Sequence, residues 1–158
     1  SMQFRTPWEE IGETEFDAQV NANLYATLSL LQHYLPGMQQ RGWGRAVTLG
    51  SVQQSVPHPQ MAVYAATKCA VMSLVRNIAK QVAASGVTVN NLSPGVIATP
   101  RNEAALSDPA YNARVLAGIP AGYAGQAQDL AAAALLLCSD EGRYITGIDL
   151  PVDGGMGL

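Results

Sequence analysis

Two short strand-like runs that enclose one helical segment constrain the fold most. RAVTLGS, from Arg45 to Ser51, is short, apolar and β-branched, and GVTVNNLS, from Gly86, shows no polar alternation. Such runs are typical of buried strands in a parallel sheet. Between them, apolar residues recur at helical spacing from about Ala62 to Ala84, over an arc wide enough for burial on two sides. The sequence therefore predicts a strand–helix–strand unit with a right-handed crossover.

The same alternation continues on both sides of this unit. Helical spacing predicts one helix from Phe16 to Met38, with Thr14 as its N-cap and an end near Pro36-Gly37. A third helix is expected over Gln126 to Ser139, and a last strand over Gly147 to Val152. This order of elements indicates an α/β fold with about three parallel strands and helices on both faces of the sheet.

Composition favours a packed fold that binds neither nucleic acid nor membranes. Hydrophobic residues make up 48% and charged residues 13% of the 158, so we expect one domain over residues 3–158. The formal net charge of −3 and the scarcity of lysine, which occurs only at Lys68 and Lys80, argue against an anionic partner surface. No signal peptide or membrane-spanning stretch is evident, so a cytoplasmic protein is expected. Ser1-Met2 is interpreted as a protease scar ahead of a natural start at Met2.

A candidate active site lies at the carboxyl ends of the two central strands. Tyr64 and Lys68 are one helical turn apart, so the ammonium would share a face with the phenol and stabilise a phenolate. Ser51 ends the first strand, and Pro94-Gly95 with Thr99 follows the second, at the edge where open α/β sheets bind ligands. Reduction of a carbonyl needs a hydride on carbon and a proton on oxygen, and a phenol beside a cation can supply the proton. The alternatives are a solvated Tyr64–Lys68 pair and an ordinary serine at a strand end.

Five stretches together resemble the short-chain dehydrogenase/reductase family, in the order and spacing that this family uses. They are FDAQVNANLYA, GRAVTLGS, YAATK, GVTVNNLSPGVIATP and YITGIDLPVDGG, and they span the chain from about residue 7 to its end. The resemblance implies a partial Rossmann-like three-layer fold and an NAD(P)-dependent oxidoreductase that interconverts carbonyls and alcohols. It also aligns Asn23 with the asparagine of the family's active site. The alternative is that Asn23 is a polar residue satisfied where helices pack.

The resemblance implies a role for each site residue. Ser51 would hydrogen-bond the substrate oxygen, Lys68 would also hold the nicotinamide ribose, and Asn23 would hold a water that links Lys68 to solvent. The backbone around Ile97 and the Thr99 hydroxyl resemble the family's contacts to the nicotinamide carboxamide. The expected catalytic set is Asn23, Ser51, Tyr64 and Lys68, and the expected contacts to NAD or NADP are Tyr64, Lys68, Pro94, Gly95, Ile97 and Thr99.

The chain departs from the family pattern at its beginning. The family fold starts with a strand, a glycine-rich turn and a helix that receives the pyrophosphate. Neither G-x-x-x-G-x-G nor G-x-G-x-x-G occurs in this sequence. We therefore expect a C-terminal portion that lacks the first four strands, keeps the catalytic side chains and is inactive as this chain alone.

The open edge of the first strand predicts a partner. An unpaired apolar strand edge is a template for another chain, and the apolar arcs of the first two helices add to it. A homo-oligomer, either a dimer or a tetramer, is expected. The alternative to an enzyme is a non-catalytic oligomeric scaffold or interaction module derived from one.

Several further residues have weaker interpretations. Ile97 to Gly125 is expected to be a long loop, and the family resemblance implies that it covers the substrate. Within it, Arg101 and Arg114 are either contacts to an anionic substrate or, more simply, solvated arginines. His58 lies in a proline-flanked loop, either lining the pocket or as a plain loop histidine. Asp153, before two glycines, indicates a turn and not a metal site.

Two cysteines lie in apolar helical patterns. Cys69 follows Lys68 in the central helix, and Cys138 follows three leucines in the third helix. We expect two buried, reduced thiols with neither a disulfide nor a metal.

Overall fold

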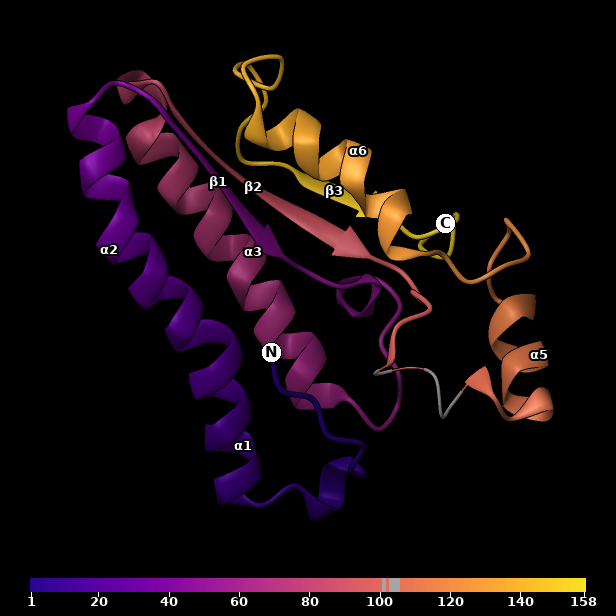
Figure 1. The fold of residues 1–158 in the computed structure, drawn as a ribbon. Coiled ribbons are helices and arrows are strands. Elements are labelled where there is room, and N and C mark those ends of the chain that lie inside the picture. The colour runs from indigo at the N-terminus through magenta and orange to yellow at the C-terminus, as the bar shows by residue number, and fades with distance from the viewer. Residues whose placement is uncertain (101, 103–105) are drawn as a thin grey trace.

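A parallel three-stranded sheet forms the centre of the molecule (Figure 1). The computed structural model describes residues 1–100, 102 and 106–158. Within them, β1 (Gly44–Leu49), β2 (Val87–Pro94) and β3 (Asp149–Val152) lie in the order β1-β2-β3. Both strand pairs are parallel. The predicted α/β fold with three parallel strands is confirmed.

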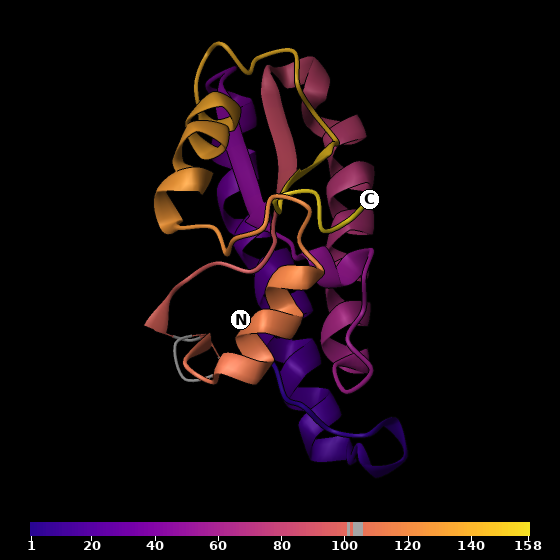
Figure 2. The ribbon, with the colours of Figure 1, turned by 90° about the vertical axis from the view of Figure 1, so that its right-hand side faces the viewer.

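Helices cover both faces of this sheet. Figure 2 shows α6 (Ala127–Cys138) on one side of the strands and α3 (Ala62–Val82) on the other. Next to α3 runs α2 (Ala26–Gln40), which contacts β1 and α3. The three layers predicted from the alternating elements are therefore present.

The main core lies between the sheet and the α2–α3 layer. Val75 of α3 and Val89 of β2 have no exposed surface. β2 is buried over nearly its whole length, as predicted from its lack of polar alternation. The buried core residues are Leu31, Leu35, Val71, Met72, Val75, Ala79, Val82, Val87 and Val89.

β1 is less buried than expected. Its central residues are half-buried, and Leu49 at its end is 61% exposed. Among the described residues β1 pairs only with β2, so it is an edge strand of the sheet. Its apolar sequence therefore does not produce burial on both faces within this chain.

The first helical segment is longer than predicted and has different ends. It runs through α1 (Glu13–Val20), a π-helical turn η2 (Asn21–Tyr25) and α2 without a break. Gly12 precedes its first residue, so the expected N-cap at Thr14 was wrong. Pro36 lies inside α2, although an end was expected there.

A Schellman motif ends this helix after Gln40. The N–H of Gly42 donates to the carbonyl of Gln39 (3.2 Å), and the N–H of Trp43 donates to that of Met38 (3.3 Å). Gly42 has a positive φ of 70°, which glycine adopts without steric cost. These bonds satisfy the last carbonyls and explain why the helix ends here and not at Pro36.

Four short elements complete the description: η1 (Trp8–Glu10), η3 (Val52–Gln54), η4 (Ala83–Ser85) and α5 (Pro109–Ala117). The interpretation of 97–125 as one long loop missed α5. Its signal was Asp108 followed by Pro109, since an aspartate N-cap before a proline at N1 is a typical helix start. The Asp108 carboxylate accepts hydrogen bonds from the N–H groups of Ala110 (2.9 Å) and Tyr111 (3.2 Å).

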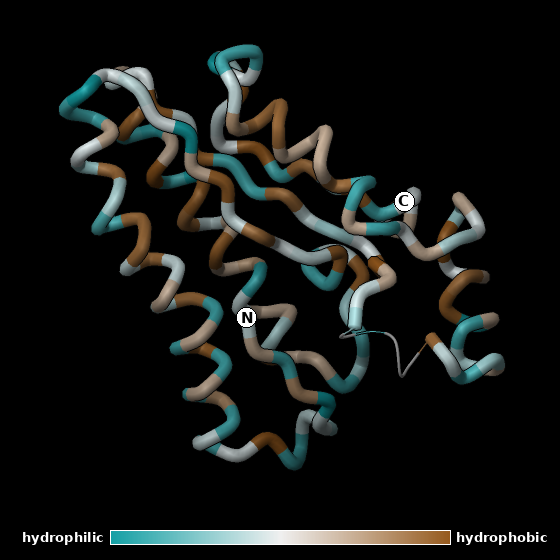
Figure 3. Tube along the Cα trace, in the orientation of Figure 1, coloured by the Kyte–Doolittle hydropathy of each residue, from teal (hydrophilic) through white to brown (hydrophobic). Residues whose placement is uncertain are grey.

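The outer helix faces are more apolar than a solvated surface requires. Hydrophobic segments recur along α2 and α6 (Figure 3), and Leu135 and Leu136 of α6 are exposed.

Cys69 and Cys138 are free and exposed, so the expected burial of both thiols was wrong. An apolar helical pattern does not say which of its faces is covered. None of the described helices combines the length and apolarity that crossing a bilayer requires.

Two glycine-to-alanine substitutions test the course of α2. Gly37→Ala should raise the free energy of unfolding by about 0.5–1 kcal/mol, because position 37 is an exposed helix interior with room for a methyl group. Gly42→Ala should lower it by about 1–2 kcal/mol, because alanine is strained at positive φ. Denaturant unfolding measures both. Equal effects would contradict a helix that continues to Gln40.

Candidate active site

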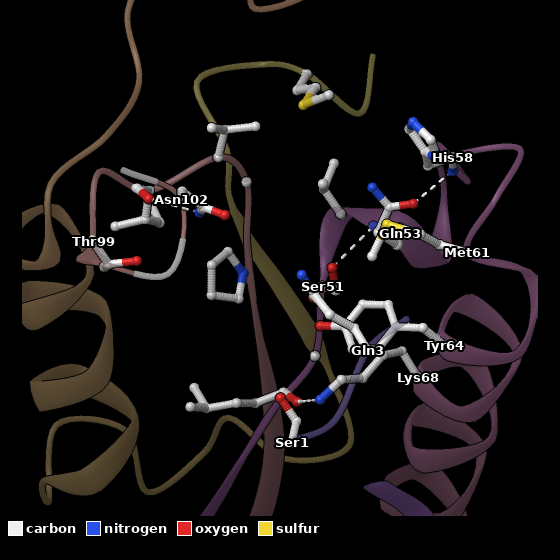
Figure 4. A pocket seen from close by; sticks show the side chains of 18 of the residues that line it. Ser1, Gln3, Ser51, Gln53, His58, Met61, Tyr64, Lys68, Thr99 and Asn102 are labelled. Atoms are coloured by element: carbon white, nitrogen blue, oxygen red, sulfur yellow. Dashed lines mark hydrogen bonds between the residues drawn. The ribbon is translucent and has the colours of Figure 1, made fainter. Parts of the chain in front are cut away.

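A cavity of about 460 Å³ lies at the carboxyl ends of β1 and β2. Ser51 and Tyr64 lie on one wall of it and point into the same space, while Thr99 lies on the opposite wall (Figure 4). The predicted site residues that line it are Ser51, Tyr64, Lys68, Pro94, Gly95, Ile97 and Thr99. The loops after both strands thus converge as parallel strand ends should.

Tyr64 and Lys68 face the cavity from the first turns of α3. The Lys68 Nζ atom lies 5.5 Å from the centroid of the Tyr64 ring, and the Lys68 residue is only 4% exposed. Nζ donates a hydrogen bond to the carbonyl of Leu49 (2.7 Å) at the end of β1. That carbonyl holds the ammonium beside the phenol, so the pair is not a solvated surface pair.

Ser51 lies two residues beyond β1, not within it, as the N-cap of η3. Its Oγ atom accepts from the N–H of Gln53 (3.2 Å), and its N–H donates to Oε1 of Gln54 (3.1 Å). Because backbone N–H groups occupy the acceptor side, the hydroxyl hydrogen can point into the cavity. Gly50 before it leaves no room for a side chain, since a Cβ there would collide with Gln54, Asn91 and Ser93.

A polar network beneath η3 fixes this loop. The Asp149 carboxylate accepts from Nδ2 of Asn91 (2.8 Å) and Oγ of Ser93 (2.6 Å) through one oxygen. Its other oxygen accepts from Nε2 of Gln54 (3.1 Å). Gln54 in turn holds the N–H of Ser51. Sequence reasoning missed Gln54 and Asp149, whose adjacency appears only when β3 pairs with β2.

Asn23 lies behind α3 and does not line the cavity. It falls in the π-helical turn η2 and is only 2% exposed. Its side chain pairs twice with the backbone of Met2, accepting from the N–H (2.7 Å) and donating to the carbonyl (2.8 Å). Nδ2 also donates to Oγ1 of Thr67 (3.2 Å), which donates to the carbonyl of Tyr64 (2.7 Å). Asn23 thus contacts α3 directly, through Thr67.

The loop after β2 forms the wall opposite Tyr64. Gly95 donates its N–H to the carbonyl of Val152 (3.0 Å), which ties the loop to β3. The carbonyl of Ile97 accepts from Nδ2 of Asn102 (2.9 Å), and the Thr99 side chain lines the cavity. The turn predicted at Asp153 is present, because its carboxylate accepts from the N–H groups of Gly155 and Gly157 (both 2.9 Å).

Sequence reasoning also missed Arg5 and Tyr111, which line the cavity together with His58. Nη2 of Arg5 donates to Oη of Tyr111 (2.8 Å). Arg114 lies one helical turn further along α5, with its Cζ atom 5.3 Å from the Tyr111 ring centroid. The position of Arg5 in the cavity could not be predicted from the sequence, because its hydrogen-bond partner Tyr111 is 106 residues away. Arg101, the other arginine expected in this region, lies outside the described residues.

His58 experiences a positive environment. Burial lowers its pKa below the ordinary 6.5, and the charges of Arg5 and Arg114 lower the pKa further. Its Nδ1 atom accepts from the N–H of Gln60 (3.1 Å), a bond that protonation of Nδ1 would remove. The neutral imidazole is therefore favoured, and His58 lines the pocket as one of the two alternatives proposed.

A titration of His58 tests this environment. Its midpoint, followed by NMR and assigned with His58→Gln, should lie below pH 6.5 and rise when Arg5 and Arg114 are both changed to Gln. Since the folded-state pKa is lowered, the stability that depends on neutral His58 is present above pH 6.5 and lost as pH falls through the folded-state midpoint. Arg41→Gln, at the far end of α2, is the control and should not move the midpoint. A wild-type midpoint at or above 6.5 would contradict the interpretation.

Known proteins share both the sequence and the fold of this chain. A family model described as enoyl-(acyl carrier protein) reductase matches residues 2–157. The chain is 38% identical over 139 residues to the 3-oxoacyl-[acyl-carrier-protein] reductase of Haemophilus influenzae, covering 88% of this chain and 57% of that protein. It therefore spans less than two thirds of the length of this relative.

Two solved structures show the fold likeness. A gluconate 5-dehydrogenase from Burkholderia cenocepacia, in complex with NADP and tartrate, has a TM-score of 0.95 and 33% identity, covering 99% of this chain and 61% of that one. A short-chain type dehydrogenase/reductase from Mycobacterium ulcerans has a TM-score of 0.95 and 29% identity, covering 100% of this chain and 57% of that one. The partial Rossmann-like fold is confirmed, and the chain belongs to the short-chain dehydrogenase/reductase family.

Proposed function

We propose that this chain carries the catalytic residues of an NAD(P)-dependent oxidoreductase that interconverts a carbonyl and an alcohol. The observation that carries the proposal is the convergence of Ser51, Tyr64 and Lys68 on one cavity. A bound nicotinamide would supply or accept the hydride. The residues of the chain would bind the substrate oxygen, move its proton and orient both molecules.

Tyr64 would transfer the proton to or from the substrate oxygen. Negative charge on its oxygen would be stabilised by the Lys68 ammonium, which the Leu49 carbonyl holds near the ring. Ser51 would donate its hydroxyl hydrogen to the same substrate oxygen while charge develops there. Burial of the ammonium strengthens its interaction with the phenolate relative to water.

We assign Asn23 the fourth position in this site, at the start of a path from Lys68 to solvent. Support comes from its location behind α3, one hydrogen bond from Thr67 and two from the backbone of Tyr64. The π-helical turn that contains Asn23 is a feature often found at functional positions.

Residues on both walls of the cavity could hold a nicotinamide ribose. Lys68 offers a buried cationic donor for ribose hydroxyls, and the cavity also has the Thr99 hydroxyl and the Pro94-Gly95 backbone. Solved relatives include the NADP complex of the gluconate 5-dehydrogenase. The cofactor is therefore proposed to be NAD or NADP. The glycine-rich pyrophosphate motif does not occur in this sequence, so we propose that the chain alone binds the adenosine half weakly and has no measurable turnover.

Substitution of Tyr64 tests the catalytic proposal. Tyr64→Phe should lower kcat by about 10²- to 10⁴-fold, because the general acid is removed while the ring remains. The assay uses the protein in the form that its native cells produce. Absorbance of NAD(P)H measures turnover with a panel of carbonyl substrates. Tyr144→Phe, at a fully exposed tyrosine, is the matched control. Equal loss in both variants, or none in Tyr64→Phe, would remove Tyr64 from the mechanism.

Nicotinamide mononucleotide separates the two halves of the cofactor. The isolated chain should bind reduced nicotinamide mononucleotide about as tightly as NADPH, since only the nicotinamide half finds contacts. Fluorescence titration measures both. Much tighter binding of NADPH would refute weak binding of the adenosine half. Binding of neither, with no turnover in the gene product, would favour the alternative, a non-catalytic oligomeric scaffold.

We further propose that the chain forms a homo-oligomer, a dimer or tetramer. Leu30 and Tyr34 on the outer side of α2 are each 58% exposed, and Tyr25 of η2 is similarly open. Burial of such side chains against a second copy stabilises the contact by removing apolar area from water.

Light scattering coupled to size exclusion should give a mass of at least twice 16.6 kDa at micromolar concentration. Leu30→Asp with Tyr34→Asp should reduce it, and a folded wild-type monomer would contradict the proposal. A cytoplasmic location stays a prediction.

A further inference from the structure

The cavity wall is positive although the chain is acidic. The sequence has 12 acidic and 9 basic residues. Nevertheless Arg5 and Lys68 line the cavity, and none of its lining residues, all from the described part of the chain, is an aspartate or glutamate. A concave site with one sign of charge raises the local concentration of ligands of opposite sign. The cavity therefore favours an anion.

Two guanidiniums lie near one phenol ring that lines this cavity, and of the two arginines Arg5 is itself part of the lining. The Cζ atoms of Arg5 and Arg114 lie 5.4 Å and 5.3 Å from the Tyr111 ring centroid. Among residues 1–100, 102 and 106–158, the structure has one salt bridge, between Arg45 and Asp140. Neither Arg5 nor Arg114 therefore pairs with a carboxylate in this part of the chain. Two positive groups that share one neutral ring leave a net positive charge around it, which a bound anion would offset. Both guanidiniums also act on His58 inside the cavity, since they add to the lowering of its pKa by burial.

We propose that Arg5, Tyr111 and Arg114 form a subsite for the carboxylate of a small hydroxy or oxo acid. The reacting carbon of this acid would lie at Ser51 and Tyr64, so the inference rests on the proposed function and names its substrate class. Guanidinium forks match a carboxylate with two parallel hydrogen bonds. The Tyr111 oxygen already accepts from Arg5, which leaves its own hydrogen for the acid.

The rest of the wall suits such a substrate. Gln3 and Gln53 line the same cavity and offer amide groups to hydroxyls along the acid. Arg5 and Tyr111 belong to the cavity lining itself, so the anion enters the cavity. A small acid fits this arrangement better than an acidic protein, which would dock on the outer surface.

D-gluconate and D-sorbitol test the subsite, because they share a carbon count and differ in one carboxylate. NMR titration of the full chain should show saturable shifts at His58 and Tyr111 with gluconate and none with sorbitol. Arg5→Gln and Arg114→Gln should each weaken gluconate binding about tenfold or more, as expected for loss of a charge-assisted hydrogen bond. Both arginines are exposed, so the variants should fold, and a thermal melt checks this. Arg41→Gln, an exposed arginine after α2, is the matched control and should bind as the wild type does.

Further outcomes separate this inference from the proposed function. Suppose that the wild type and Tyr64→Phe both bind gluconate, but the protein from its native cells transfers no hydride. This result would overturn the catalytic proposal and keep the subsite. Equal binding of gluconate and sorbitol, or no effect of either arginine, would overturn the subsite alone. A third outcome also overturns the subsite. In it, the wild type does not bind gluconate but does bind an acyl chain on an acidic carrier protein, and both arginine variants bind that acyl carrier protein more weakly.

Discussion

The need to satisfy two buried asparagines of β2 determines how the rest of the chain is arranged. Asn90 and Asn91 are completely buried, where an unpaired amide would be strongly destabilising. Asn90 donates to the carbonyl of Ile145 (2.8 Å) and accepts from the N–H of Ile148 (3.2 Å), which positions the approach to β3. Asn91 donates to Asp149, the residue that also accepts from the Ser51 loop through Gln54. One central strand thus places both its neighbour β3 and the loop that carries Ser51.

Regular periodicity predicted most of the fold, and its failures share a physical cause. β2 and α3 were predicted within two residues at each end, because strong patterns come from burial by neighbouring elements. Pro36 was misinterpreted because a proline inside a helix is tolerated when packing holds the turns on both sides, here Leu35 before it and Met38 after it. Exposure of Cys138 could not be predicted, since periodicity locates an apolar stripe without naming its partner.

The candidate site was predictable only where its residues have fixed spacing. The turn between Tyr64 and Lys68 is set by helix geometry, and strand ends bring Ser51 and Thr99 to one edge. Contacts between distant segments left no such trace, as the bond from Arg5 to Tyr111 shows. The location of Asn23 behind α3 likewise depends on how the N-terminal residues lie along that helix, which no local pattern records.

The π-helical turn at Asn21–Tyr25 ties the length of this segment to the geometry around it. Such a turn accommodates one residue more than the α-helical path would. Each residue of an α-helix advances the side-chain direction by about 100°. Deletion of one residue in this turn would therefore let it revert to the α-helical path and keep α1 and α2 nearly in phase, while Asn23 would lose the position from which it reaches Thr67. The extra residue shapes the contact with α3 more than it shapes the helix that carries it.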